Sequence, residues 1–316
     1  MHILINDGLS QNAIKDLEKN KHSVKNVRVA ASQLESYIQK HNIEVLVVRS
    51  ATKVTSTLLE SSPSLKLIVR AGIGIDNINI ATAQKLGIKV KNTPGIASRS
   101  VAELVMAHIY TGFRYLHDAN RIMPLEGDSH FKQLKRAYEK ANEIQNKTLG
   151  IIGFGKIGKE VAKLAYTNGM RVISIDRNKN DNILTIHFPN NQEIHFKVPL
   201  YSFNEVLLQS DVISIHTPAL NNHLIGRDEI AKMKTGAGII NAARGGLLNE
   251  KAAIDALENE KLRFLALDTF ENEPTPSIQT LMHPNISLSP HIGGTTIEAQ
   301  ERIGKKVVEI INNFKG

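Results

Sequence analysis

A glycine-rich stretch near the middle of the chain predicts a βαβ unit. The apolar run Leu149–Ile152 leads into Gly-x-Gly-x-x-Gly, formed by Gly153, Gly155 and Gly158, and a helical pattern follows. The first glycine allows a tight turn, the second lets a pyrophosphate approach the backbone, and the third lets helix and strand pack closely. The amino end of the helix offers unpaired N–H groups and a positive dipole end to phosphates. This pattern favours a dinucleotide-binding fold.

An acidic residue at the end of the next strand indicates which dinucleotide binds. The predicted strand Arg171–Ile175 ends at Asp176, eighteen residues after Gly158. A carboxylate at this place accepts hydrogen bonds from the adenosine ribose hydroxyls and repels a 2′-phosphate. The combined pattern therefore predicts NAD as the cofactor.

The composition restricts the class of protein. With 316 residues, 41% of them hydrophobic, the chain is long enough to bury two cores, so two domains are expected. The absence of cysteine excludes disulfides, thiolate metal sites and cysteine nucleophiles, and no metal site is predicted. No apolar run has the length of a bilayer span, and residues 1–7 lack the features of a signal peptide. We therefore expect a cytoplasmic protein without membrane contact.

The chain is basic, with a formal net charge of +8 and a pI near 9.4. Its lysines are spread among acids, without a basic arm or an aromatic-basic module. Nucleic acid is therefore not expected as a partner, and the positive bias is interpreted as a surface that also attracts anionic small molecules.

Short aliphatic strands alternate with helical patterns on both sides of a long amphipathic helix, predicted from Arg99 to about Arg121. This alternation indicates parallel sheets covered by helices. The final helix, about Thr296 to Phe314, comes too late in the sequence to belong naturally to the second sheet, so we expect it to return to the first domain. The strands are predicted at Ile3–Ile5, Val45–Val48, Leu67–Val69, Ile88–Val90, Leu149–Ile152, Arg171–Ile175, Val212–Ile215, Gly238–Asn241, Phe264–Leu267 and Ile286–Ser289.

The predicted domain boundaries follow from the return of the final helix to the first domain. Residues 1–96 and 287–316 form one domain, and a dinucleotide-binding domain at 97–286 is inserted into it. Within the insertion, two alternating runs over 183–198 surround a Pro-Asn-Asn turn and predict a β-hairpin. We interpret this hairpin as a packed surface decoration, with a place beside the adenosine pocket or in a subunit contact as the alternatives.

Three polar segments follow predicted strands of the inserted domain: Asn241–Gly246, Asp268–Pro274 and Ser289–Gly294. The carboxyl ends of parallel strands are where open α/β sheets bind ligands. In the first segment, Arg244 is flanked by small residues and can hold a carboxylate with two parallel hydrogen bonds.

Together these motifs resemble those of the D-isomer-specific 2-hydroxyacid dehydrogenase family, with similarity from about Val45 to the C-terminus. The sequence departs from the family pattern at Ala97, where Asn is usual, and at Ile73, where a small polar residue is common. The matching stretches are Arg70–Asn77, Asn92–Gly95, Ser100–Glu103, the glycine-rich stretch, His216–Pro218, Asn241–Leu248, Asp268–Pro274 and Pro290–Gly294.

The resemblance implies an α/β fold with two doubly wound parallel-sheet domains, a Rossmann NAD-binding domain inserted into a flavodoxin-like substrate domain. It implies reversible NAD-dependent oxidation of a D-2-hydroxy acid, and a homodimer or higher homo-oligomer. The implied catalytic residues are Arg244, Glu273 and His291. The implied cofactor contacts are Gly153, Gly155, Lys156, Ile157, Gly158, Asp176, His216, Thr217, Pro218, Ala242, Ala243, Asp268, Gly293 and Gly294. The implied substrate contacts are Arg49, Ser50, Gly72, Ile73, Gly74, Arg244 and His291.

The reaction explains why these residue types are needed. A base must take the hydroxyl proton as C2 gives up hydride, and a histidine backed by a carboxylate suits this role. His291 with Glu273 fits, and Arg244 would orient the substrate carboxylate. Glu271 is a competitor for Glu273, and His216 is the only other histidine at a predicted strand end.

The stretch from Val48 to Thr55 most resembles the D-3-phosphoglycerate dehydrogenases of this family, in which an arginine meets the substrate phosphate. Arg49 would take that role; the alternative is a structural role for Arg49. The resemblance implies a short form without the regulatory ACT domain, acting in serine biosynthesis. The alternatives are a glyoxylate or hydroxypyruvate reductase, a D-lactate dehydrogenase, or an NAD-sensing corepressor-like binding protein.

Overall fold

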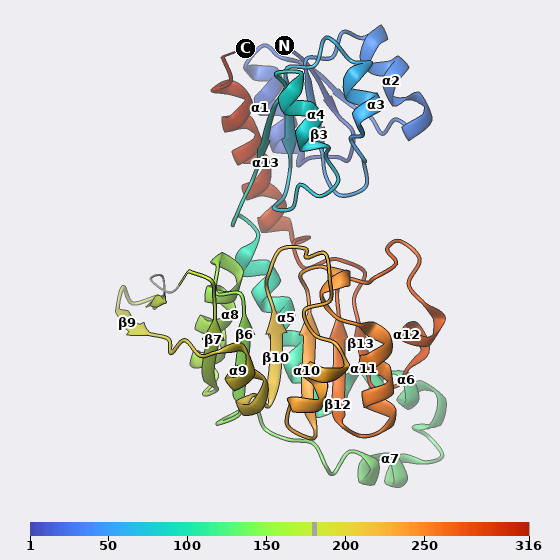
Figure 1. Ribbon diagram of the computed structural model, residues 1–316, viewed down its shortest axis with the longest axis vertical. Helices are drawn as coiled ribbons and strands as arrows, with labels where there is room; N and C mark the ends of the chain where they lie inside the picture. Colours follow the sequence, from blue (N-terminus) through green and yellow to red (C-terminus); the bar gives the residue numbers. More distant parts are fainter. Residues whose placement is uncertain (179–181, 316) are drawn as a thin grey trace. The chain divides into compact units, whose positions relative to one another are not determined.

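The computed structural model describes residues 1–178 and 182–315, and the chain divides into two compact units (Figure 1). Unit 1 comprises Met1–Ala97 and Gly294–Gly316, and unit 2 comprises Ser98–Gly293. Each unit is built on an open parallel sheet with helices on both faces, so the predicted fold class is confirmed.

Unit 1 has five parallel strands in the order β2-β1-β3-β4-β5, which is the flavodoxin-like order. The strands are β1 (His2–Ile5), β2 (Ser23–Asn26), β3 (Val45–Val48), β4 (Leu67–Arg70) and β5 (Lys89–Asn92). β2 was not predicted, because this edge strand has the sequence Ser-Val-Lys-Asn and buries none of its four residues fully. The central strand β3 is apolar throughout and fully buried, as strands covered on both faces are.

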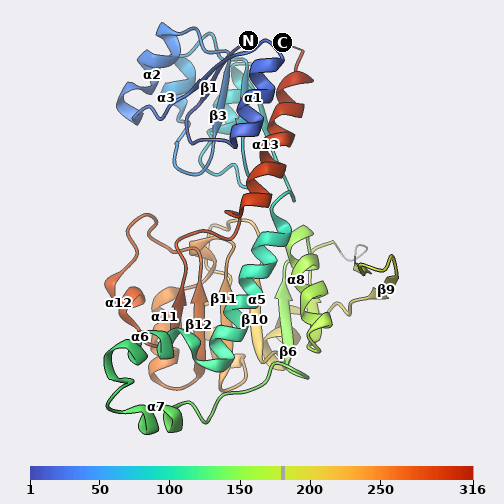
Figure 2. The same ribbon diagram turned by 180° about the vertical axis from the view of Figure 1, so that it is seen from behind.

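Two separate cores cover the two faces of this sheet. One contains residues of α1 and α13, and the other contains residues of α2, α3 and α4 (Figures 1 and 2). The final helix therefore returns to unit 1, as predicted, because its apolar stripe packs on α1 and the sheet. The helices are α1 (Gln11–Lys19), α2 (Ala31–Lys40), α3 (Ser56–Glu60), α4 (Ile80–Lys85) and α13 (Ile297–Asn312).

Unit 2 has six parallel strands in the order β13-β12-β11-β10-β6-β7. Beyond β7, Leu200 forms a single parallel bridge with Ser174. The arrangement is thus the dinucleotide-binding order with its third strand reduced to one bridge. The strands are β6 (Thr148–Ile152), β7 (Arg171–Ile175), β10 (Val212–Ile215), β11 (Ala237–Asn241), β12 (Leu262–Leu267) and β13 (Ile286–Leu288).

Helices α5 and α8 cover one face of the second sheet, as Figure 2 shows, and α9, α10 and α11 cover the other. A short 3₁₀ turn, Gly245–Leu247, follows β11. The helices of unit 2 are α5 (Ser98–Arg114), α6 (Leu116–Glu126), α7 (Phe131–Ala137), α8 (Lys156–Thr167), α9 (Phe203–Gln209), α10 (Arg227–Lys232), α11 (Glu250–Glu258) and α12 (Ile278–Met282).

Two predicted boundaries were wrong. Residues 287–293 belong to unit 2 and not to unit 1, because β13 pairs with β12 and the chain leaves the unit only after Gly293. The long helix predicted from Arg99 to Arg121 is two helices, because Tyr115 adopts a left-handed conformation with φ 55° between α5 and α6. Such a residue cannot continue a right-handed helix.

The predicted hairpin consists of β8 (Ile183–His187) and β9 (Glu193–Lys197), which pair in antiparallel register. One side of the hairpin packs on unit 2, since Leu184 is buried and Phe196 contacts Tyr166 of α8. The two rings meet edge to face, with 4.6 Å between their centroids.

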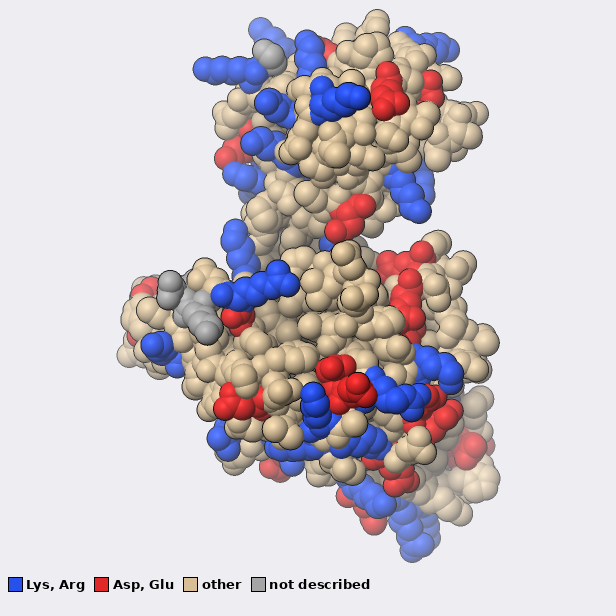
Figure 3. Space-filling model, viewed as in Figure 1, with Lys and Arg blue, Asp and Glu red and all other residues tan. Residues whose placement is uncertain are grey.

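Charges of both signs are interspersed on the visible face of unit 2 (Figure 3). Among the described residues, no helix is both long and apolar enough to cross a bilayer.

Candidate active site

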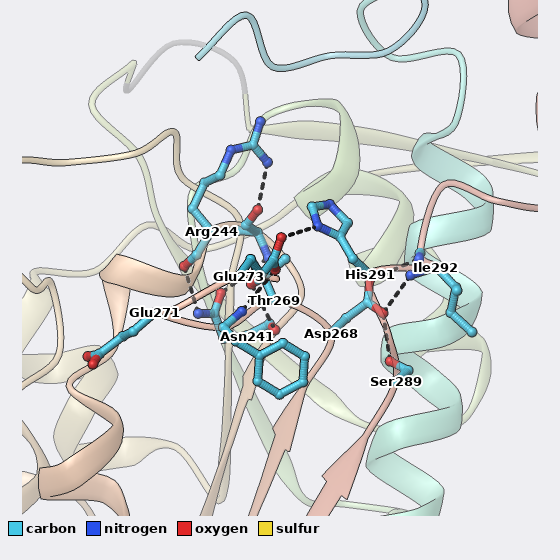
Figure 4. A network of polar contacts seen from close by, with 12 residues as sticks. Asn241, Arg244, Asp268, Thr269, Glu271, Glu273, Ser289, His291 and Ile292 are labelled. Atoms are coloured by element: carbon cyan, nitrogen blue, oxygen red, sulfur yellow. Dashed lines mark hydrogen bonds and ion pairs between the residues drawn. The ribbon is translucent and has the colours of Figure 1, made fainter. Parts of the chain in front are cut away.

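The three predicted catalytic residues lie beyond the carboxyl ends of three adjacent strands of unit 2. Arg244 follows β11, Glu273 follows β12 and His291 follows β13 (Figure 4). Because these strands are parallel neighbours, their carboxyl ends meet at one edge of the sheet. Segments distant in the sequence are therefore brought into one cluster.

Glu273 and His291 form a direct pair, with 2.9 Å between Oε2 of Glu273 and Nδ1 of His291. The other oxygen of Glu273 accepts the Phe270 N–H at 3.0 Å. Burial by itself raises the pKa of Glu273. The hydrogen bond and charge of His291 lower this pKa, and the Phe270 N–H and the Arg244 guanidinium lower it further by smaller amounts. Together they outweigh burial, so the pKa of Glu273 lies below its usual value. An ionised carboxylate on Nδ1 places the proton there and leaves Nε2 of a neutral ring as an acceptor.

The turn that carries His291 is held by Asp268. The backbone of His291 is left-handed, with φ 55°. Oδ1 of Asp268 accepts the Ile292 N–H at 2.8 Å and the Ser289 hydroxyl at 2.6 Å, and Oδ2 accepts the Gly293 N–H at 2.8 Å (Figure 4). An uncommon backbone conformation persists only where the surroundings determine it. Asp268, predicted as a cofactor contact, thus serves the histidine turn in this structure.

Arg244 stands at the start of the 3₁₀ turn after β11. The Asn241 amide donates to the Arg244 carbonyl at 2.8 Å and accepts the Ala243 N–H at 3.2 Å, which fixes the backbone of this segment. The guanidinium donates to the Ala243 carbonyl at 2.7 Å. Asn241 is fully buried, and its bracing role was missed because a strand-terminal Asn has no distinctive sequence signal.

The competing carboxylate, Glu271, is turned away from His291 (Figure 4). It pairs with His223 at 2.9 Å and accepts the Glu250 N–H at 3.1 Å, while Glu250 accepts the Glu271 N–H at 2.7 Å. The structure therefore identifies Glu273 as the carboxylate that contacts His291.

A cavity of about 440 Å³ lies beside the Glu273–His291 pair. Its remaining lining is almost entirely apolar: Phe270, Pro274, Pro276, Leu281, Leu288, Ser289 and Pro290. Low-polarity surroundings strengthen the electrostatic interaction between the two side chains.

The glycine-rich turn fits the phosphates of a dinucleotide. Gly153 has φ +97°, and a Cβ there would lie 2.7 Å from the His216 carbonyl oxygen. A Cβ on Gly158 would lie 2.2 Å from the Gly153 carbonyl oxygen, whereas one on Gly155 would meet nothing within 4 Å. Gly155 is thus open to an approaching ligand, and α8 begins beside it without a side-chain cap.

Asp176 lies beside this turn, as its place after β7 predicts. Its Oδ2 accepts the Phe154 N–H at 2.6 Å, and its Oδ1 accepts the Asn178 N–H at 2.8 Å. The carboxylate is thus held next to the glycines, where the ribose of NAD would need it. The residues present fit this cofactor.

His216 differs from a simple cofactor contact. Its Nε2 lies 2.8 Å from the Ser214 hydroxyl, and burial lowers its pKa to about 3. The ring is therefore neutral and turned inward. Its backbone carbonyl lines the Gly153 turn, so His216 supports the predicted site through its main chain.

The structure places the predicted substrate residues Arg49, Ser50 and Gly72–Gly74 in unit 1, together with the predicted cofactor residue Gly294. Asp7 fixes the loop after β3, since its carboxylate accepts the N–H groups of Arg49 at 2.7 Å and Thr52 at 3.1 Å. Burial lowers the pKa of Arg49, and the charge of Asp7 opposes this.

Comparisons with known proteins agree with this geometry. Residues 106–293 match the family model described as "D-isomer specific 2-hydroxyacid dehydrogenase, NAD binding domain". The chain is 40% identical to a hydroxypyruvate reductase from Thermotoga maritima over 313 residues, covering 97% of this chain and 96% of that one. It is 39% identical to a D-3-phosphoglycerate dehydrogenase from Methanocaldococcus jannaschii over 314 residues, covering 98% of this chain but 56% of that one.

A solved structure of D-lactate dehydrogenase from Aquifex aeolicus, complexed with NAD and lactic acid, matches with a TM-score of 0.79 and 28% identity. The match covers 99% of this chain and 94% of that one. Unit 2 is thus an NAD-binding domain, and the chain belongs to the D-isomer specific 2-hydroxyacid dehydrogenase family as an NAD-dependent member.

Proposed function

We propose that this protein interconverts a D-2-hydroxy acid and its 2-keto acid through Arg244, Glu273 and His291. The observation that carries this is the 2.9 Å contact between Glu273 and Nδ1 of His291, which leaves Nε2 as the proton acceptor. In oxidation, Nε2 takes the hydroxyl proton, and Glu273 stabilises the imidazolium that forms. Arg244 holds the substrate carboxylate in a bidentate grip. NAD, held by the glycine-rich turn and Asp176, would supply the hydride acceptor for C2.

We propose 3-phosphoglycerate as the substrate, with 3-phosphohydroxypyruvate as the product, a step of serine biosynthesis. Arg49 supports this proposal. It is partly buried, and among the described residues its guanidinium makes no direct hydrogen bond or ion pair, although the charge of Asp7 acts on it. A partly buried cation without a direct anionic partner is costly, and an anion that binds to it lowers this cost. A phosphate would supply that anion.

Hydroxypyruvate reduction is the second candidate. It is favoured by the relative from Thermotoga maritima, which this chain matches over nearly its whole length, whereas the chain spans only 56% of the phosphoglycerate dehydrogenase from Methanocaldococcus jannaschii. The two candidates differ in one chemical group, the phosphate, so Arg49 distinguishes them.

The test compares Arg49→Ala with wild type on phosphohydroxypyruvate and on hydroxypyruvate, followed by NADH absorbance. A charge-assisted contact contributes about 1.5–3 kcal/mol, so its loss should lower kcat/KM for the phosphorylated acid about ten- to hundredfold. The value of kcat/KM for the unphosphorylated acid should fall only slightly. Lys53→Ala is the matched control, because Lys53 is an exposed cation on the same loop.

Equal losses on both acids would assign Arg49 a structural role and favour the hydroxypyruvate reductase. Binding of NADH without turnover of any 2-keto acid would instead favour an NAD-sensing binding protein.

A further inference from the structure

A buried histidine outside the proposed catalytic set is linked to the His291 turn. His108 lies on α5 and is 5% exposed. Its Nδ1 is 2.9 Å from the Ser287 hydroxyl, and its Nε2 is 3.1 Å from the Ser289 hydroxyl. The imidazole thus bridges the two serines that flank Leu288 near the end of β13.

The direction of these hydrogen bonds follows from the donors present. The Ser289 hydroxyl has one proton and donates it to Asp268 at 2.6 Å. It can therefore only accept from His108, so Nε2 of His108 carries a proton. Burial lowers the pKa of His108, an effect that the charge of Asp268 opposes and His117 reinforces. A neutral ring then accepts at Nδ1 from the Ser287 hydroxyl.

The chain of donors continues to the turn that carries His291. Besides the Ser289 hydroxyl, the groups of the described residues that donate to Asp268 are two backbone N–H groups of that turn, those of Ile292 (Figure 4) and Gly293. The backbone of Ser289 is also tied in, since its N–H donates to the Leu267 carbonyl and its carbonyl accepts the His291 N–H, each at 3.0 Å. The orientation of the Ser289 hydroxyl therefore affects where the Asp268 carboxylate lies, and with it the hydrogen bonds of Asp268 to the turn.

We propose that His108 is a positioning residue for the reaction: by donating to Ser289 it orients the hydroxyl toward Asp268 and so holds the turn that places His291. This inference rests on the proposed function, because it assumes that His291 is the base. The physical basis of the proposal is geometric, since a small displacement of a catalytic group lowers the reaction rate without weakening cofactor binding.

The test uses His108→Leu, which removes the donor, and His108→Gln, whose amide N–H can replace Nε2. Ile109→Val is the matched control, a fully buried neighbour on α5 that makes no polar contact with the network. Each full-length variant is assayed with hydroxypyruvate and NADH, and amide hydrogen exchange is measured at Ile292 and Gly293.

We expect His108→Leu to lower kcat about three- to tenfold, the effect of losing one hydrogen bond, with the KM for NADH unchanged. Exchange at Ile292 and Gly293 should accelerate. His108→Gln should restore most of the wild-type kcat and most of the slow amide exchange at Ile292 and Gly293. Ile109→Val should resemble wild type in both measurements. If His108→Leu does not fold, Ser289→Ala breaks the same chain of hydrogen bonds from the turn side and should show the same two changes.

Wild-type kcat and exchange in His108→Leu, or in Ser289→Ala, would overturn the inference. Equal effects of His108→Leu and Ile109→Val would do the same. A His291→Ala variant separates this inference from the proposed function. Undiminished turnover in that variant would reject His291 as the base, whereas the exchange rates at Ile292 and Gly293 still decide whether His108 holds the turn.

Discussion

At the scale of single residues, the Glu273–His291 pair makes oxidation depend on pH in a defined direction. The lowered pKa of Glu273 keeps its carboxylate ionised at neutral pH and below. Oxidation depends on this ionised carboxylate to hold the proton on Nδ1 of His291, so its rate should fall as the pH drops through the pKa of Glu273. In Glu273→Gln this fall should be lost, and kcat should be lower by about tenfold or more.

The check is a pH profile of kcat/KM for oxidation in both proteins. Glu271→Gln is the control, since Glu271 contacts His223 and Glu250 and not His291. The same change of the pH profile in both variants would argue against a specific role for Glu273.

Asp176 supports a second prediction at this scale, on cofactor choice. Asp176→Ala should lower the ratio of kcat/KM for NAD over NADP about ten- to hundredfold, because a charged contact to the ribose and a repulsion of the 2′-phosphate are both lost. Arg177 is exposed beside it and available to a phosphate. Asp176→Asn distinguishes the charge of Asp176 from its role in holding the turn, since the amide oxygen can still accept the Phe154 N–H. A wild-type preference for NADP would disprove the assignment.

At the scale of elements, the hairpin of β8 and β9 is joined to α8 by the contact between Phe196 and Tyr166. Phe196→Ala should lower the stability of unit 2 by about 1–3 kcal/mol, less than for a fully buried Phe because Phe196 is half-buried. This corresponds to a decrease in Tm of several degrees, measurable by calorimetry. Ile194→Ala, at a 52% exposed position of the same strand, should change Tm little.

NAD affinity should be the same in both hairpin variants if the hairpin is a packed decoration. A weaker affinity in Phe196→Ala without a change in Tm would instead place the hairpin beside the adenosine pocket.

At the scale of the whole molecule, α6 and α7 bury none of their residues. Leu125 is 75% exposed and Phe131 59%, a level of apolar exposure typical of an interaction surface. We expect a homodimer in which these helices take part. Leu125→Glu with Phe131→Glu should shift light scattering toward monomer, whereas Ile297→Glu, at an 82% exposed position on α13, should not. A wild-type monomer at working concentration would refute this.

Most of the fold could be predicted because its signals are local. The buried strand β3 is a continuous aliphatic run and β10 is aliphatic except for Ser214, and the bounds of both were predicted correctly. The glycine turn and Asp176 follow from a fixed backbone geometry. The element boundaries that were wrong depend on a single conformation, as at Tyr115, or on pairing with a partner strand, as at β13.

The sequence by itself determined the two sheets, the cofactor and the three polar segments at strand ends, since periodicity and turn chemistry act over a few residues. Only the tertiary structure decided that Glu273 and not Glu271 meets His291, and that Asp268 holds the histidine turn. It alone joined His108 to Ser289, 181 residues further along the chain. Such contacts depend on how distant segments pack and which donors then face which acceptors, and no local pattern encodes that.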